Sequence, residues 1–119
     1  MKRLLLMLVV CGMASISYSQ GNYYLEQAEN YQREAQRYAT QAESYEREAE
    51  YYNKQAQDYL KDAEYYSKRG DNDKASTRQN WAREAMRKST TYLEWAAQER
   101  KKAQQRLEWA NEAMKKARN

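Results

Sequence analysis

Tyrosine and alanine each recur every seven positions through the first half of the chain, and the two lines are three or four residues apart. This spacing is typical of the a and d positions of a heptad, which form one face of an α-helix. The tyrosines are Tyr24, Tyr31, Tyr38, Tyr45, Tyr52, Tyr59 and Tyr66. The alanines are Ala28, Ala35, Ala42, Ala49, Ala56 and Ala63. The pattern predicts one continuous helix over about residues 23–69, with Asn22 as its N-cap.

Charged residues on the opposite face of this helix support the same prediction. An acid precedes a base by four residues at Glu29–Arg33, Glu43–Arg47, Glu50–Lys54 and Glu64–Lys68. Each such pair stabilises an isolated helix by a few tenths of a kcal/mol in this orientation.

A single turn signal interrupts the pattern. Gly70 is the only glycine between residues 22 and 119, and Asp-Asn-Asp follows it. Glycine closes helix ends and these polar residues cap helix starts, so we expect a turn over residues 70–73. A calcium loop opening at Asp71 is excluded, because its sixth and twelfth positions hold Ser76 and Ala82 instead of Gly and Glu.

Two lines with the same seven-residue period continue after the turn. One line consists of Ala75, Ala82, Ser89, Ala96, Ala103, Ala110 and Ala117, and the other of Met86, Leu93, Arg100, Leu107 and Met114. They predict a second helix over about residues 73–118, about 70 Å long like the first. The fold class is therefore all-α: a long antiparallel two-helix hairpin, an alanine/tyrosine heptad coiled coil.

The register of the hairpin follows from its turn. If facing residues have numbers that add to 145, alanine meets alanine and tyrosine meets methionine or leucine, as in Tyr59–Met86 and Tyr52–Leu93. The centre of this register lies between residues 72 and 73, inside the expected turn. It also places Arg100 opposite Tyr45, where a guanidinium can stack on the ring.

Tryptophan recurs every fourteen residues outside the predicted seam, with lysine at the intervening heptads. Together with neighbouring tyrosines these rings form a candidate interaction surface, the aromatic flank: Trp81, Trp95, Trp109, Tyr92, Tyr51 and Tyr65. Three interpretations stay open. The rings widen the seam by lying over Lys and Arg stems, they mediate self-association into a four-helix bundle or docking of a partner helix, or they stack on the sugars of a cell-wall glycan.

The N-terminus has the features of a cleaved signal peptide, residues 1–19. Lys2 and Arg3 precede an apolar stretch over residues 4–14, and Ser17 and Ser19 provide small residues before a cut at Gln20. The apolar stretch is too short to span a membrane, so no transmembrane span is expected in the mature chain. These features predict that the chain is exported to the periplasm or out of the cell. The alternative is a membrane-anchored lipoprotein that is acylated at Cys11.

Composition excludes most chemistry. The chain has 21 Lys and Arg, 17 Asp and Glu, one Cys and no His or Pro, and Cys11 lies in the leader. The mature chain thus lacks the His and Cys ligands usual for zinc or copper and the His base of nucleophilic sites, so we expect no catalytic residue, metal or cofactor. Acids and bases alternate along the helices, which disfavours nucleic acid as a partner.

These observations predict a non-enzymatic exported protein with a structural, scaffolding or adaptor role in the bacterial cell envelope. The alternative is a periplasmic binding module or chaperone-like protein that holds a polypeptide or cell-wall glycan through its Trp and Tyr side chains.

Overall fold

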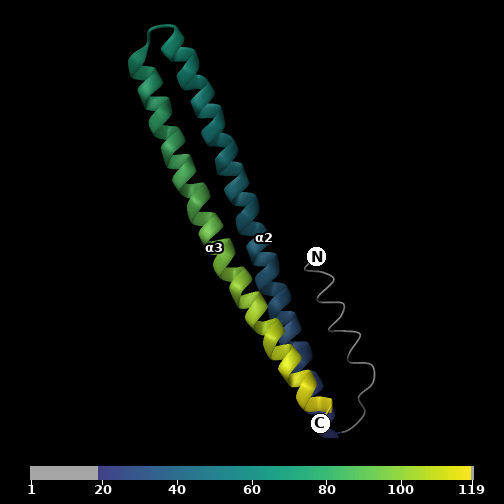
Figure 1. The fold of residues 1–119 in the computed structure, drawn as a ribbon. Coiled ribbons are helices and arrows are strands. Elements are labelled where there is room, and N and C mark those ends of the chain that lie inside the picture. The colour runs from purple at the N-terminus through teal and green to yellow at the C-terminus, as the bar shows by residue number, and fades with distance from the viewer. Residues whose placement is uncertain (1–18, 119) are drawn as a thin grey trace. The chain divides into compact units, whose positions relative to one another are not determined.

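A computed structural model describes residues 19–118 and shows two long helices joined by a turn (Figure 1). Helix α2 runs from Ser19 to Lys68 and helix α3 from Asn72 to Arg118, and no strand occurs among these residues. The all-α helical hairpin predicted from the sequence is confirmed. Except for Ser19, the predicted signal peptide lies outside the described residues, as does Cys11, so cleavage and lipidation stay predictions.

The hairpin divides into two compact units, and each contains a segment of both helices. The first unit, called the turn unit here, covers Gln41–Gln98. The second, called the terminal unit, combines residues 19–40 with residues 99–118 among those described. In both units the two helical segments pack against each other through small side chains.

Alanine rows form the buried centre of each unit. All six alanines predicted for the first helix are 0–3% exposed, and Ser89 with the alanines of the second row from Ala75 to Ala110 are at most 8% exposed. In the turn unit Ala56 clusters with Ala82 and Ala85. Side chains this small allow two helix backbones to approach closely.

Gly70 ends α2 in the way predicted from the sequence. Its φ of 79° lies in the left-handed region, which a residue with a Cβ rarely adopts. The N–H of Asp71 donates to the carbonyl of Tyr66 at 3.0 Å, and that of Gly70 donates to Ser67 at 3.0 Å. This pair of bonds is a Schellman motif, which satisfies carbonyl groups at the end of the helix.

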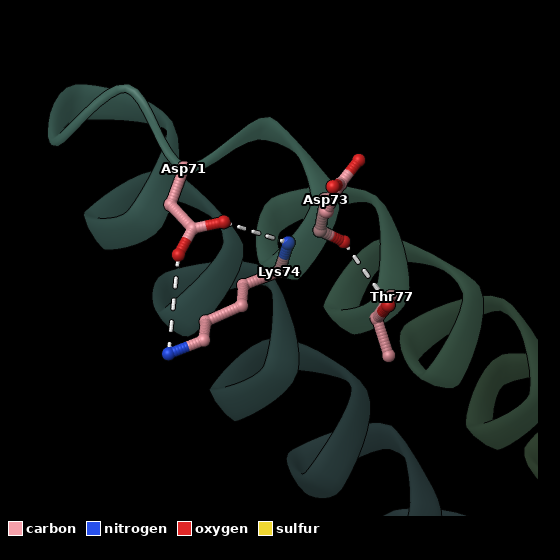
Figure 2. Close-up of polar contacts among 4 residues, drawn as sticks. All are labelled: Asp71, Asp73, Lys74 and Thr77. Carbon is pink, nitrogen blue, oxygen red and sulfur yellow. Dashed lines mark hydrogen bonds and ion pairs between the residues drawn. The ribbon is translucent and has the colours of Figure 1, made fainter.

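Asp71 is the N-cap of α3. Its Oδ1 accepts a hydrogen bond from the backbone N–H of Lys74 at 3.2 Å, and its Oδ2 lies 3.9 Å from the ammonium of the same residue (Figure 2). One turn further on, the hydroxyl of Thr77 donates to the carbonyl of Asp73 at 3.0 Å. The turn carboxylate therefore caps a helix, in agreement with the sequence prediction.

The helix boundaries differ slightly from the prediction. α2 starts at Ser19 instead of residue 23, so Asn22 lies inside the helix and the prediction of an Asn22 cap is wrong. The linking residues are Arg69–Asp71 instead of 70–73, because the cap at Asp71 starts α3 one residue early.

The predicted register is wrong for the tyrosine row, by about five residues. Tyrosines of α2 meet Trp and Lys side chains of α3 whose numbers add to 140 instead of 145, as in Tyr45–Trp95 and Tyr52–Lys88. Tyr31 nevertheless packs against the buried cluster that contains its predicted partner, Met114. The alanine rows consequently interdigitate instead of meeting head-on. Ser89, for example, donates its hydroxyl to the carbonyl of Ala49 at 2.8 Å, where Ala96 was expected to face Ala49. Stacking of Arg100 on Tyr45 stays a prediction.

Half of the predicted surface ion pairs form. Arg33 lies 3.6 Å from Glu29 and Lys68 lies 3.2 Å from Glu64. Within residues 19–118, Glu43 and Glu50 make no ion pair, although both have a base four residues ahead.

Candidate interaction surface

Every tyrosine of the heptad row on α2 contacts a residue of the lysine–tryptophan row on α3. Rings meet edge to face at Tyr31–Trp109, Tyr45–Trp95 and Tyr59–Trp81, with centroids 5.5–5.6 Å apart. The other four tyrosines lie under a lysine ammonium, 5.3–5.9 Å from the ring centre, at Tyr24–Lys116, Tyr38–Lys102, Tyr52–Lys88 and Tyr66–Lys74. The fourteen-residue spacing of tryptophan thus matches an alternation of Tyr–Trp and Tyr–Lys layers within each unit.

The residue before each tyrosine on α2 varies with the same alternation. Before the tyrosines that meet tryptophan it is small and polar: Asn30, Ser44 and Asp58. Before those that meet lysine it is large: Tyr23, Arg37, Tyr51 and Tyr65. A tryptophan layer therefore has a small polar residue beside its tyrosine on α2, and a lysine layer has Tyr or Arg there. This alternation is called the layer rule here.

Arginine clamps one face of two tryptophans. Arg106 has its Cζ 4.3 Å from the centre of the Trp109 ring and 5.5 Å from that of Tyr38, and its Nε donates to Glu34 at 2.5 Å. Stacked guanidinium groups that also pair with a carboxylate hold a ring in place from two directions.

The turn unit contains the same arrangement. Arg78 lies 4.3 Å over Trp81 and 5.6 Å over Tyr66, and it pairs with Asp62 at 3.8 Å. Each of these residues is 28 positions from its counterpart in the terminal unit on the same helix. The two units thus carry one motif twice.

All six residues predicted for the aromatic flank are at least partly exposed. The exposed fractions are 42% for Trp81, 44% for Trp95, 38% for Trp109, 56% for Tyr51 and 52% for Tyr65. Tyr92 is less exposed than these, because its ring packs against other rings of the turn unit. It stacks on Tyr52 with centroids 5.7 Å apart and planes 7° apart, and it meets the edge of Trp95 at 5.3 Å.

The exposed tyrosines are held by their neighbours on α2. Tyr51 lies at 73° to Tyr52, and its hydroxyl accepts a hydrogen bond from Gln55 at 3.0 Å. Tyr65 lies at 71° to Tyr66 and beneath the guanidinium of Arg69, 4.9 Å from the ring centre. These rings are exposed yet restrained, which lowers the entropy lost when a partner covers them.

A shallow groove crosses the flank in the turn unit. Its walls are Tyr52, Gln55, Tyr59, Trp81, Glu84, Ala85 and Lys88. The groove combines ring surface with amide, carboxylate and ammonium groups, which is a composition suited to polar chains such as polypeptides.

The structure also reveals an apolar surface that the sequence analysis assigned to the core. Met86 is 50% exposed and Leu93 is 51% exposed, so their predicted burial against the tyrosine row is wrong. In the turn unit Tyr59 packs against the cluster of Ala56, Ala82 and Ala85, and Tyr52 stacks on Tyr92. Leu60 on α2 is 46% exposed as well. The alternation of Trp and Lys along α3 is the sequence signal that could have indicated which side of α3 faces the tyrosines.

No group of three or more Asp, Glu, Cys or His side chains among residues 19–118 is placed to hold a metal ion. Neither helix in this range has a stretch long and apolar enough to cross a membrane.

No protein-family model, curated protein or solved structure matches this chain. A proposal about its function therefore depends on the arrangement of its own side chains.

Proposed function

We propose that this chain is a non-enzymatic, exported structural protein of the bacterial cell envelope that works as a scaffold or adaptor, with the aromatic flank as its docking surface. The observation that carries the proposal is the row of partly exposed rings clamped by arginine, tyrosine and glutamine side chains. Tryptophan, tyrosine and arginine are the residues that contribute most at protein interfaces. A rigid helical pair that presents them in fixed layers suits a helical partner.

Site-specific cross-linking in cells tests this proposal. A photo-reactive phenylalanine analogue replaces Tyr51 or Tyr65, and Gln57, an exposed residue of the same helix away from the flank, is the control position. We expect adducts with one or a few defined envelope proteins from positions 51 and 65 and none from position 57. Equal adducts at all three positions, or none at any, would contradict docking through the flank.

A loss-of-function variant gives the second arm of the experiment. Tyr51→Gln with Tyr65→Gln removes two rings that are more than half exposed, so the hairpin should keep its helical circular dichroism. Capture of the cross-linked partner by the purified mature chain should fall at least tenfold. Leu60→Gln, which removes an exposed apolar side chain elsewhere, is the matched control and should leave capture unchanged.

The flank groove favours a second candidate function, a chaperone-like module that holds an extended polypeptide. That function predicts suppression of aggregation of an unrelated reduced protein, whereas an adaptor binds only its own partner. A cell-wall glycan is a weaker candidate, because Arg78 and Arg106 already cover one face of Trp81 and Trp109. Co-sedimentation with purified peptidoglycan distinguishes it from both.

A further inference from the structure

Four aromatic rings of the turn unit form an unbroken series of contacts across the two helices, called the ring series here. Trp95 meets Tyr92 edge to face with centroids 5.3 Å apart, and Tyr92 stacks on Tyr52 at 5.7 Å. Tyr52 in turn meets the edge of Tyr51 at 5.2 Å. Tyr45 lies beside the start of the series, 5.6 Å from Trp95 and 6.0 Å from Tyr92. All these distances are typical of rings in direct contact.

Both ends of the ring series are accessible to solvent. Trp95 is 44% exposed and Tyr51 is 56% exposed, whereas Tyr92 and Tyr52 between them are partly buried. The hydroxyl of Tyr51 accepts a hydrogen bond from Gln55 at 3.0 Å, so its own hydrogen is not used in that bond and can pass to water. The series therefore connects an exposed indole to an exposed phenol through two shielded phenol rings.

A second exposed tyrosine of the turn unit lacks such a connection. Tyr65 is 52% exposed and lies edge to face on Tyr66, as Tyr51 lies on Tyr52. Within residues 41–98, however, neither Tyr65 nor Tyr66 contacts a tryptophan ring. Tyr65 is thus a matched comparison for Tyr51.

The other tryptophan of the turn unit is also placed differently. Trp81 contacts the ring of Tyr59, and this pair meets no further ring within residues 41–98. Arg78 lies 4.3 Å over Trp81, and a positive charge at this distance disfavours the loss of an electron from the indole. An electron vacancy at Trp81 therefore has no series of rings by which to reach the surface tyrosines.

We propose that the ring series is a one-electron relay that makes Tyr51 the site at which strong one-electron oxidants modify this protein. The oxidant, a peroxide-derived radical or an oxidised metal complex, takes one electron from the Trp95 indole, whose N–H proton passes to water. The indolyl radical then regains an electron and a proton as Tyr92 becomes a phenoxyl radical. The same exchange carries the radical to Tyr52 and on to Tyr51.

The balance of the relay is simple, because every ring before the last is restored. In sum, Tyr51 loses one electron and its hydroxyl proton, and the oxidant gains the electron. At neutral pH a phenoxyl radical is more stable than an indolyl radical, so the transfer runs from tryptophan to tyrosine. The relay goes beyond the docking function of the aromatic flank and does not depend on it.

An exposed phenoxyl radical couples with a second one. The new C–C bond joins the carbons ortho to the two hydroxyl groups, and the hydrogens on these carbons move to the two oxygens. Two oxidised copies of the chain are thereby joined through a dityrosine at position 51. Oxidation of Trp95 then ends as a covalent cross-link instead of as damage to the indole.

Photo-oxidation of the purified mature chain, residues 20–119, tests the relay. Light that tryptophan absorbs and tyrosine does not excites the indoles, and a pentaamminecobalt(III) complex takes up the electron irreversibly. A nitroso spin trap labels tyrosyl radicals, and peptide mass spectrometry measures the label at each tyrosine. We expect Tyr51 to carry more label than Tyr65. Equal labelling of the two positions would overturn the inference.

Phenylalanine substitutions keep each ring in place but prevent its oxidation. Tyr92→Phe and Trp95→Phe should each lower the label at Tyr51 to the level at Tyr65. Tyr45→Phe, which touches the same two rings but lies off the path, and Trp81→Phe are the controls and should leave the label unchanged. Label at Tyr51 that survives both Tyr92→Phe and Trp95→Phe would contradict the relay.

Omitting the spin trap tests the product. Covalent dimers with dityrosine fluorescence should form, and Tyr51→Phe should abolish them while Tyr65→Phe should not. Dimers that depend on Tyr65 and not on Tyr51 would refute the assignment of Tyr51. Because the purified chain is oxidised without a partner, neither result depends on whether the aromatic flank docks another protein.

Discussion

Replacing Arg106 by Met removes the clamp on Trp109 but preserves the apolar stem of the side chain. Arg106 and Glu34 have side chains that are 20% and 34% exposed, so their ion pair is partly shielded and contributes about 1 kcal/mol. The contacts with Trp109 and Tyr38 add about 0.5–1 kcal/mol each. The free energy of unfolding should therefore fall by about 2 kcal/mol.

Urea denaturation followed by circular dichroism measures this loss, and Trp109 fluorescence reports the local change. A double-mutant cycle with Glu34→Gln should give a coupling of about 1 kcal/mol that shrinks in 1 M NaCl, since salt screens the ion pair. Arg47→Met is the control, because Arg47 is exposed and makes no ion pair among the described residues. If Arg106→Met costs no more than Arg47→Met, the clamp does not stabilise the hairpin.

Three further substitutions test the seam and the turn by thermal and urea unfolding. Ala56→Leu should destabilise the hairpin by about 1–3 kcal/mol, because Ala56 is 1% exposed between alanines, whereas Leu at the exposed Ala97 should be tolerated. Gly70→Ala should cost about 1 kcal/mol because φ is 79°, although no atom lies near the added Cβ, and Gly70→Asn should cost less. Ser89→Ala should lower the free energy of unfolding by about 1 kcal/mol or less, because it removes the hydrogen bond to the Ala49 carbonyl. Ser89→Val should lower it further, because it also adds volume. Equal stabilities of the two variants would contradict a close approach of the helices at Ser89.

Periodicity predicted the helices of this fold well, because few structures other than a close helix–helix seam place alanine at every seventh residue. The turn was equally predictable, since the Gly70 and Asp71 backbone and side-chain bonds involve only neighbours in sequence. The register of the two helices was harder to predict from the sequence. Met86 and Ala85 both adjoin the α3 alanine row, and the heptad spacing alone does not decide which of them faces the tyrosines. That choice depends on the direction of the tyrosine rings and on their fit to tryptophan and lysine.

The candidate surface was only partly predictable, because it also depends on how the two helices are paired. The tryptophans stand out in the sequence, but the stacking of Tyr92 on Tyr52 depends on how the two helices are staggered. The exposure of Met86 and Leu93 was missed because the heptad spacing of α3 alone does not show which side of its alanine row faces the tyrosines.

The layer rule restricts how the length of this hairpin can change. Deleting seven residues from α2 alone leaves that helix with an intact alanine row, so the sequence of the helix itself shows no defect. Every layer beyond the deletion, however, then combines the wrong partners: tryptophans meet the tyrosines preceded by a second large side chain, and lysines meet those preceded by Asn, Ser or Asp. Removing the heptad of α3 that faces the deletion restores every layer. We therefore expect the loss of one heptad from either helix to be tolerated only together with the loss of the heptad that faces it in the other helix.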